Sequence, residues 1–197
     1  MRNIAIVLLA IGIIFIAAGG YQLFKTNHAQ KSSLQEARTI LAEEKVETSA
    51  GSDSSINKEN FRPEHGETVG ILTIPRLEAD LPIVEGTDED ELEKGVGHYH
   101  GTAYPRQNDQ IVLSGHRDTV FRRMGELELG DILTVQLSYG DFSYEIVETE
   151  VVDAEDRTVI SPTAPKEVLT VTTCYPFSYI GNAPDRYIIT ALPVDDS

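Results

Sequence analysis

An apolar segment close to the N-terminus constrains the fold of this chain more than any other feature. Ile4 to Gly20 carries no charged or amide side chain, and the apolar character continues to Phe24 with Tyr21 and Gln22 as interruptions. At about 1.5 Å per residue, a helix of this length spans a hydrocarbon core of roughly 30 Å. The apolar core of a cleaved signal peptide is the alternative, but it is usually only about 7–15 residues long. We therefore interpret residues 1–24 as an uncleaved membrane anchor.

The charges that flank the anchor do not set its orientation, because Arg2 precedes the span and Lys25 and Lys31 follow it. Orientation normally follows an excess of Lys and Arg on the cytoplasmic side. A very short segment in front of a large folded domain favours an N-terminus inside and a domain outside. We expect a single-pass protein of the cell membrane with an extracellular domain.

The balance of charge and the change in composition divide the rest of the chain. Asp and Glu number 32 against 16 Lys and Arg, and this argues against a nucleic-acid partner, because such proteins concentrate positive charge. Residues 25–67 are polar and predict a stalk, helical near Leu34–Ala42 and flexible over Glu47–Asn60. From Thr68 onward the composition changes, and residues 68–197 suit one compact domain.

Short segments with strand character fill this domain, and turns rich in Gly, Pro and Asp separate them. They cover residues 69–74, 81–84, 111–114, 132–137, 142–152, 168–173 and 187–192. Residues 88–94 are typical of a short helix with Gly95 as its stop, and a second helical turn is expected over 119–124. Many short strands and few helices predict an all-β barrel or sandwich.

Cys174 is the only thiol of the chain and follows the β-rich run 169–173. A single cysteine cannot form an internal disulfide, so it is either a buried small apolar side chain or a nucleophile. A free thiol titrates at about 8.5 and needs a partner, usually histidine, to react as a thiolate near neutral pH. Of the five histidines we favour His116, because it follows the strand 111–114 through Gly115.

Arg186 is the third candidate, because it opens the last predicted strand. A guanidinium stays charged and donates hydrogen bonds in a fixed fork, which suits a developing oxyanion. Taken singly, Cys174, His116 and Arg186 are better explained as a structural cysteine, a surface histidine and a rim cation. Together they supply three complementary roles at three strand ends, where active-site side chains often gather. We therefore predict that the three residues share one site.

These residues resemble the motifs of the sortase family. The run Thr170–Cys174 is similar to its signature Thr-Leu-x-Thr-Cys, with Val171 in the leucine place, while Leu113–Arg117 resembles its histidine motif and Asp185–Ile188 its arginine motif. Further similar segments are Gly70–Pro75, Leu81–Gly86, Gly97–Tyr99 and Gly130–Asp131. The resemblance covers about Thr68 to Pro193 and is strongest to class D sortases of Gram-positive bacteria. The absence of Trp agrees, because pilus-building sortases usually carry an Asp-Pro-Trp lid.

The resemblance implies an eight-stranded sortase-type β-barrel with one or two short helices, and a cysteine transpeptidase of the hydrolase and peptidase class. Cys174 would attack the carbonyl of the threonine in an LPXTG-like sorting signal of secreted proteins and form an acyl-thioester. His116 would protonate the leaving amine and deprotonate the incoming one, and Arg186 would stabilise the oxyanion. The acceptor would be an amine of a peptidoglycan precursor, and the anchor would hold all participants at one membrane.

The resemblance also places the sorting signal between the loops that precede and follow the cysteine strand, about 153–167 and 175–185. The side chains that could line an apolar pocket there, or simply pack the loops, are Val159, Ile160 and Tyr179. Some sortases bind calcium through loop carboxylates, but acidic side chains such as Glu155 and Asp156 are usually only solvated. We therefore predict neither a metal nor another cofactor.

Two alternatives stay open at this point. A cysteine L,D-transpeptidase is also a cell-wall enzyme with a β-rich fold, and His100–Thr102 is similar to part of its signature. That family places its cysteine in a Ser-His-Gly-Cys stretch, whereas Cys174 follows Thr173. A non-catalytic, membrane-tethered β-domain that binds cell-wall components would use Cys174 only for packing.

Overall fold

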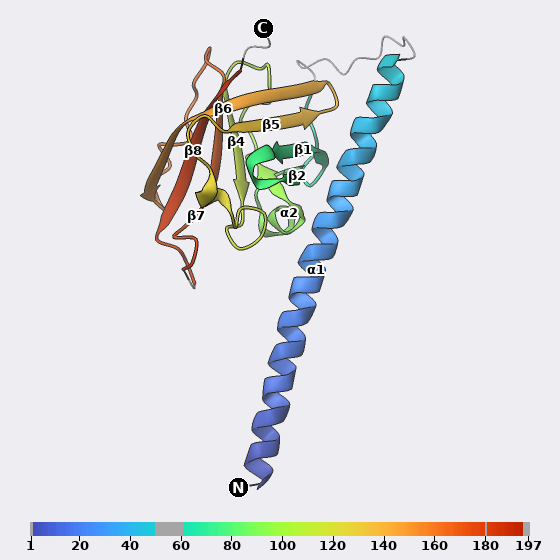
Figure 1. Ribbon diagram of the computed structural model, residues 1–197, viewed down its shortest axis with the longest axis vertical. Coiled ribbons are helices and arrows are strands. Elements are labelled where there is room, and N and C mark those ends of the chain that lie inside the picture. Colours follow the sequence, from blue (N-terminus) through green and yellow to red (C-terminus); the bar gives the residue numbers. More distant parts are fainter. Residues whose placement is uncertain (1, 50–60, 180, 195–197) are drawn as a thin grey trace.

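The computed structural model describes residues 2–49, 61–179 and 181–194, and it has one long helix beside a β-barrel (Figure 1). The helix α1 covers Arg2–Ser49. Of the described helices, it is the one long and apolar enough to cross a membrane. It does not end with the apolar run but continues to Ser49, through the first part of the polar region predicted as a stalk. Of the segment 47–60 that we expected to be flexible, residues 50–60 lie outside the described part of the chain.

Eight strands follow α1 and close into a barrel. Their bounds are β1 Thr68–Ile74, β2 Ala79–Glu85, β3 Val96–His98, β4 Gln110–Gly115, β5 Ile132–Leu137, β6 Gly140–Asp153, β7 Val168–Tyr175 and β8 Asp185–Pro193. Neighbours around the barrel run β1-β2-β3-β4-β7-β8-β6-β5, and β5 pairs with β1. The predicted eight-stranded all-β barrel is therefore confirmed.

Three local features differ from the expectation. Strand β3 was not predicted, because three residues are too few to show an alternating pattern. The helix predicted over 88–94, in contrast, agrees with the structure and is present as α2, Glu89–Lys94. The helical turn expected over 119–124 is wrong in position: that segment forms turns, and a 3₁₀ helix, η3, follows at Met124–Glu126. A further 3₁₀ helix, η2, covers Pro75–Leu77 and was not expected.

Alternation along the strands divides each one between the core and the outer surface. In β4, β7 and β8, the side chains that join the hydrophobic core are Ile111, Leu113, Leu169, Val171, Ile189 and Ala191. Successive side chains of a strand point to opposite faces. The residues between these therefore lie on the outer face of the barrel, and that face carries the candidate site.

Candidate active site

Strands β7 and β8 bring Cys174 and Arg186 side by side. The two strands are antiparallel neighbours, and their register pairs Cys174 directly with Arg186. Residues opposite each other in such a pair share one face of the sheet, with Cβ atoms about 4.5–5.5 Å apart. Because Val171 and Ile189 of these strands join the core, the alternation places Cys174 and Arg186 on the outer face.

His116 reaches the same place from β4. Strands β4 and β7 are parallel neighbours, and their register pairs Gly115 with Thr173. His116 and Cys174 each follow this pair, so one further step of the register makes them neighbours. His116, Cys174 and Arg186 are all partly exposed. The three residues singled out from the sequence thus lie at one end of three adjacent strands, and the sulfur is not sealed in the core.

A turn directly after β4 holds His116 in position. A Cβ atom at Gly115 would lie 2.6 Å from ring atoms of Phe121, so this ring occupies the space that a larger residue would need. The carbonyl oxygen of His116 accepts hydrogen bonds from the backbone N–H of Phe121 at 3.1 Å and of Thr119 at 3.3 Å. The chain therefore folds back onto the end of β4 immediately beyond His116.

Arg117 has a role in this site that sequence reasoning did not assign. Its side chain is only 7% exposed. One guanidinium nitrogen donates to the carbonyl oxygen of Pro176 at 3.2 Å and another to that of Gly181 at 2.7 Å. The guanidinium carbon also lies 5.9 Å from the ring centroid of Tyr179. A single buried cation thus holds both arms of the β7–β8 loop, which separates Cys174 from Arg186 in sequence.

The guanidinium of Arg186 forms no ion pair with the acidic side chains of the described residues. Its Nη1 donates to the carbonyl oxygens of Asp185 at 3.0 Å and Ala183 at 3.4 Å, both in the adjoining loop. Within the described part of the chain, the other N–H groups of this guanidinium have no hydrogen-bond partner and are available to a ligand. A positive charge in this position can hold a carbonyl oxygen while that oxygen gains negative charge.

The β6–β7 loop, residues 154–167, runs alongside this face from one end of the barrel to the other. It begins near Cys174 and Arg186, where Asp153 pairs with Asp185, and it ends where β7 starts beside Gln110. Gln110 anchors its far part: Nε2 donates to the carbonyl oxygen of Val159 at 2.7 Å, and Oε1 accepts from the N–H of Ser161 at 2.9 Å. The loop therefore forms a wall along β4 and β7.

The structure separates the three residues predicted to line a substrate pocket. Ile160 lines a cavity of about 170 Å³ between the β3–β4 and β6–β7 loops, and Val159 adjoins it. Tyr179 lies at the opposite end, beside Arg117. The six residues of β4, which lead from the cavity toward Cys174, span about 20 Å. Four residues of a bound peptide in extended conformation would span about 13 Å of this length. One extended peptide along this face therefore covers most of the distance from the cavity to Cys174.

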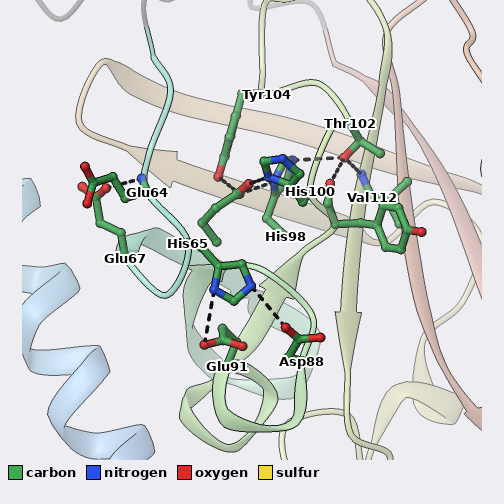
Figure 2. Close-up of polar contacts among 12 residues, drawn as sticks. Glu64, His65, Glu67, Asp88, Glu91, His98, His100, Thr102, Tyr104 and Val112 are labelled. Atoms are coloured by element: carbon green, nitrogen blue, oxygen red, sulfur yellow. Dashed lines mark hydrogen bonds and ion pairs between the residues drawn. The ribbon is translucent and has the colours of Figure 1, made fainter.

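Two other histidines belong to a polar network around Glu85 (Figure 2). The carboxylate accepts a hydrogen bond from the Tyr104 hydroxyl at 2.7 Å and lies 2.6 Å from Nδ1 of His98 and 2.9 Å from Nδ1 of His100. Burial alone would raise the pKa of Glu85. The hydrogen bond with His98 and the charge of His98, together with the hydrogen bonds of Tyr104 and His100, instead lower this pKa to about 2. The network ties β2 and β3 to the loop 99–109, which lines the cavity.

Two groups of acidic side chains outside the cysteine site have protein partners among the described residues. Asp156 accepts hydrogen bonds from the backbone and hydroxyl of Thr158, at 2.9 and 2.6 Å, and so stabilises its own turn. His65, Asp88 and Glu91 lie within 4.8 Å of one another (Figure 2). The imidazole, however, turns Nε2 toward Asp88 at 3.4 Å and Nδ1 toward Glu91 at 3.9 Å. This geometry fits a ring that bridges two carboxylates rather than three ligands of one ion.

Comparison with known proteins agrees with the barrel fold. The family model described as Sortase domain matches residues 72–194. The chain is 54% identical over 192 residues to Sortase D of Bacillus subtilis, covering 95% of this chain and 96% of that protein. It is 29% identical to Sortase SrtE1 of Streptomyces coelicolor, covering 85% of this chain and 52% of that protein. A solved Sortase D5 transpeptidase of Clostridium perfringens superposes with a TM-score of 0.69 at 26% identity, covering 85% of this chain and 99% of that one.

Proposed function

Because the chain belongs to the sortase family of cysteine transpeptidases, we propose that Cys174, His116 and Arg186 perform its transpeptidation on an LPXTG-like signal of secreted proteins. The single observation that carries this proposal is the register around β7. It places Arg186 opposite Cys174 and lets His116 follow the pair of Gly115 and Thr173. A nucleophile, a proton carrier and an oxyanion donor are the groups that acyl transfer needs.

The first half-reaction forms a thioester. The Cys174 thiolate attacks the carbonyl carbon of the threonine in the signal, and the carbonyl oxygen becomes an oxyanion. Arg186 donates hydrogen bonds to this oxygen, since its fork has no carboxylate competitor among the described side chains. The carbon–nitrogen bond then breaks, and protonated His116 gives its proton to the leaving amine. The remaining acyl group is bound to Sγ of Cys174.

The second half-reaction moves the acyl group to an acceptor amine, which we propose belongs to a peptidoglycan precursor. The amine attacks the thioester carbonyl, and neutral His116 takes its proton. Arg186 again holds the oxyanion, and the carbon–sulfur bond breaks to return the thiolate. His116 is then protonated once more, so the cycle leaves the enzyme unchanged and no external oxidant or reductant is needed.

The sorting signal lies along the outer face of β4 and β7 in this proposal, and the position of Cys174 determines which way the peptide runs. With its threonine carbonyl at Cys174, an extended signal runs back toward the cavity lined by Ile160. Gln110 keeps that end of the β6–β7 loop in place through Val159 and Ser161. In this arrangement Val159 and Ile160 contact the leading apolar residues of the signal, whereas Tyr179 lies near the scissile bond.

The anchor belongs to the same proposal. Helix α1 fixes a single-pass protein in the cell membrane, and the barrel stands on the outer side, where secreted clients and precursors meet. Confinement to one surface raises the effective concentration of all three participants.

Mass spectrometry of a captured acyl-enzyme tests the proposed chemistry. The full chain in detergent is incubated with a library of peptides that vary an LPXTG-like signal, and the intact protein is then weighed and digested. We expect an adduct on Cys174 that ends in threonine and that is absent from Cys174→Ala. An adduct on another residue, or cleavage by Cys174→Ala at a rate near that of the unaltered protein, would overturn the assignment.

A further inference from the structure

The anchor helix is held to the barrel at the point where it leaves the apolar run. Lys25 is the first residue after that run, and its Nζ lies 2.7 Å from a carboxylate oxygen of Glu93 in α2. Gln22, one turn earlier, donates to the other oxygen of Glu93 at 3.1 Å. The short helix α2 is therefore at the height of the last apolar residues of α1, which corresponds to the surface of the bilayer.

Further contacts along α1 prevent the barrel from swinging away from this position. Ser33 and Ala37 are buried against the barrel. Glu36 accepts a hydrogen bond from the hydroxyl of Thr68 at 2.8 Å, and Arg38 forms an ion pair with Asp80 at 3.1 Å. Contacts spaced over more than three helical turns fix the direction of the barrel as well as its height.

The end of the barrel that carries the candidate site is the end nearest to the apolar half of α1. In Figure 1, β4 points toward this end, and α2 and the β7–β8 loop lie there, whereas the C-terminus lies at the opposite end. Electrostatics agree: the hydrogen bond from Lys25 is the main reason that the pKa of Glu93 is lowered, and the charge of His116 also contributes. His116 directly follows β4 and therefore lies at this end of the barrel.

We infer that the mouth formed by Cys174, His116 and Arg186 opens onto the membrane surface, and that the β7–β8 loop touches the headgroup layer. This inference rests on the proposed membrane anchor. Tyr179 of that loop is 47% exposed, and tyrosine is enriched at membrane–water interfaces. The acceptor amine that reaches the thioester is then one held close to the lipid headgroups, and substrates enter along the bilayer rather than from bulk solution.

Spin labels measure this orientation directly and do not depend on activity. The full chain carrying Cys174→Ala is placed in phosphatidylcholine nanodiscs that contain a small fraction of nickel-chelating lipid. Ser178→Cys puts a label on the exposed part of the β7–β8 loop, and Asp141→Cys puts a matched label on an exposed position at the start of β6. We expect relaxation by the nickel lipid to be at least several-fold stronger at position 178. Equal relaxation at both positions, or stronger relaxation at 141, overturns the inference.

An insertion in α1 separates this inference from the proposed chemistry. Seven helix-forming polar residues between Phe24 and Lys25 lift the barrel by about 10 Å and rotate it by only about 20°. With Cys174 restored, we expect cleavage of a soluble signal peptide to be unchanged, while transfer to an amine attached to a nanodisc lipid falls about tenfold. Unchanged transfer to the lipid-bound amine contradicts the inference alone. Failure of the protein without the insertion to cleave the peptide contradicts the proposed function. The spin-label measurement at positions 178 and 141 still tests the orientation in that case.

Discussion

At the scale of single residues, Arg186 is the proposed active-site residue whose role depends most on the geometry of its guanidinium group. An ammonium group cannot present two parallel donors from one rigid plane. We therefore expect Arg186→Lys to lower the rate of acyl-enzyme formation by about 10²–10³-fold, the usual cost of losing an oxyanion donor. Stopped-flow measurement of peptide cleavage checks this, with the exposed Arg62→Lys as control. Turnover within threefold of the unaltered protein would remove Arg186 from the mechanism.

A substitution of Gln110 can affect substrate binding without affecting the chemical step, because Gln110 contacts the β6–β7 loop at the end that lies far from the sulfur of Cys174. In Gln110→Glu the donor to the Val159 carbonyl becomes an acceptor, and a buried charge is introduced. We expect KM for the signal peptide to rise about tenfold while kcat changes less than threefold, because uniform binding is lost. Gln136→Glu, on the partly exposed surface of β5, is the control. A fall in kcat with constant KM would show that Gln110 acts on the reaction itself.

At the scale of elements, the β7–β8 loop depends on Arg117. Lysine at this position keeps the charge but lacks the two arms that reach Pro176 and Gly181. We expect Arg117→Lys to loosen the loop 176–184, with hydrogen exchange about tenfold faster there, since a hydrogen bond to a charged donor contributes about 1.5–3 kcal/mol. Exchange in β1 and β5 serves as an internal reference. Unchanged protection of the loop would mean that other contacts, such as Phe177 against Gly125, are sufficient.

The elements themselves were largely predictable from the sequence, and the contacts between their ends were not. Alternating apolar residues between turn residues located seven of the eight strands, and the position of Cys174 and Arg186 at strand ends was visible in the same pattern. Strand β3 and the continuity of α1 past Phe24 were missed, because neither has a strong periodic signal. The roles of Arg117 and Gln110 could not be foreseen, since both bind backbone groups about 50–60 residues away that any sequence would supply.

At the scale of the whole molecule, the buried carboxylate of Glu85 links stability to pH. Its pKa lies at about 2, below the ordinary value of 4.5. A carboxyl group with a depressed pKa stabilises the folded state above its unfolded pKa and loses this effect as pH falls through the folded value. Between pH 4.5 and 2 we therefore expect the free energy of unfolding to lose about 3 kcal/mol from this group.

Urea unfolding in detergent at pH 6, 4 and 3 measures this loss in the unaltered protein and in Glu85→Gln. The difference in free energy between the two proteins should shrink steadily as the pH falls, because protonated Glu85 resembles the amide. Glu145→Gln, on the exposed face of β6, should follow the unaltered protein throughout. A constant difference at all three pH values would show that the pKa of Glu85 is the same in the folded and unfolded states.

Closure of the barrel has a consequence for selectivity. Among the described residues every strand has a neighbour on both sides, and β4 pairs with β7 along its whole length, so an incoming polypeptide finds no open backbone ladder between these two strands to extend. Recognition by strand addition draws its affinity from main-chain hydrogen bonds and accepts many sequences. On the proposed function, recognition of the sorting signal must therefore depend on the shape and chemistry of a few of its side chains, and the folded part of the secreted protein need not contact the barrel.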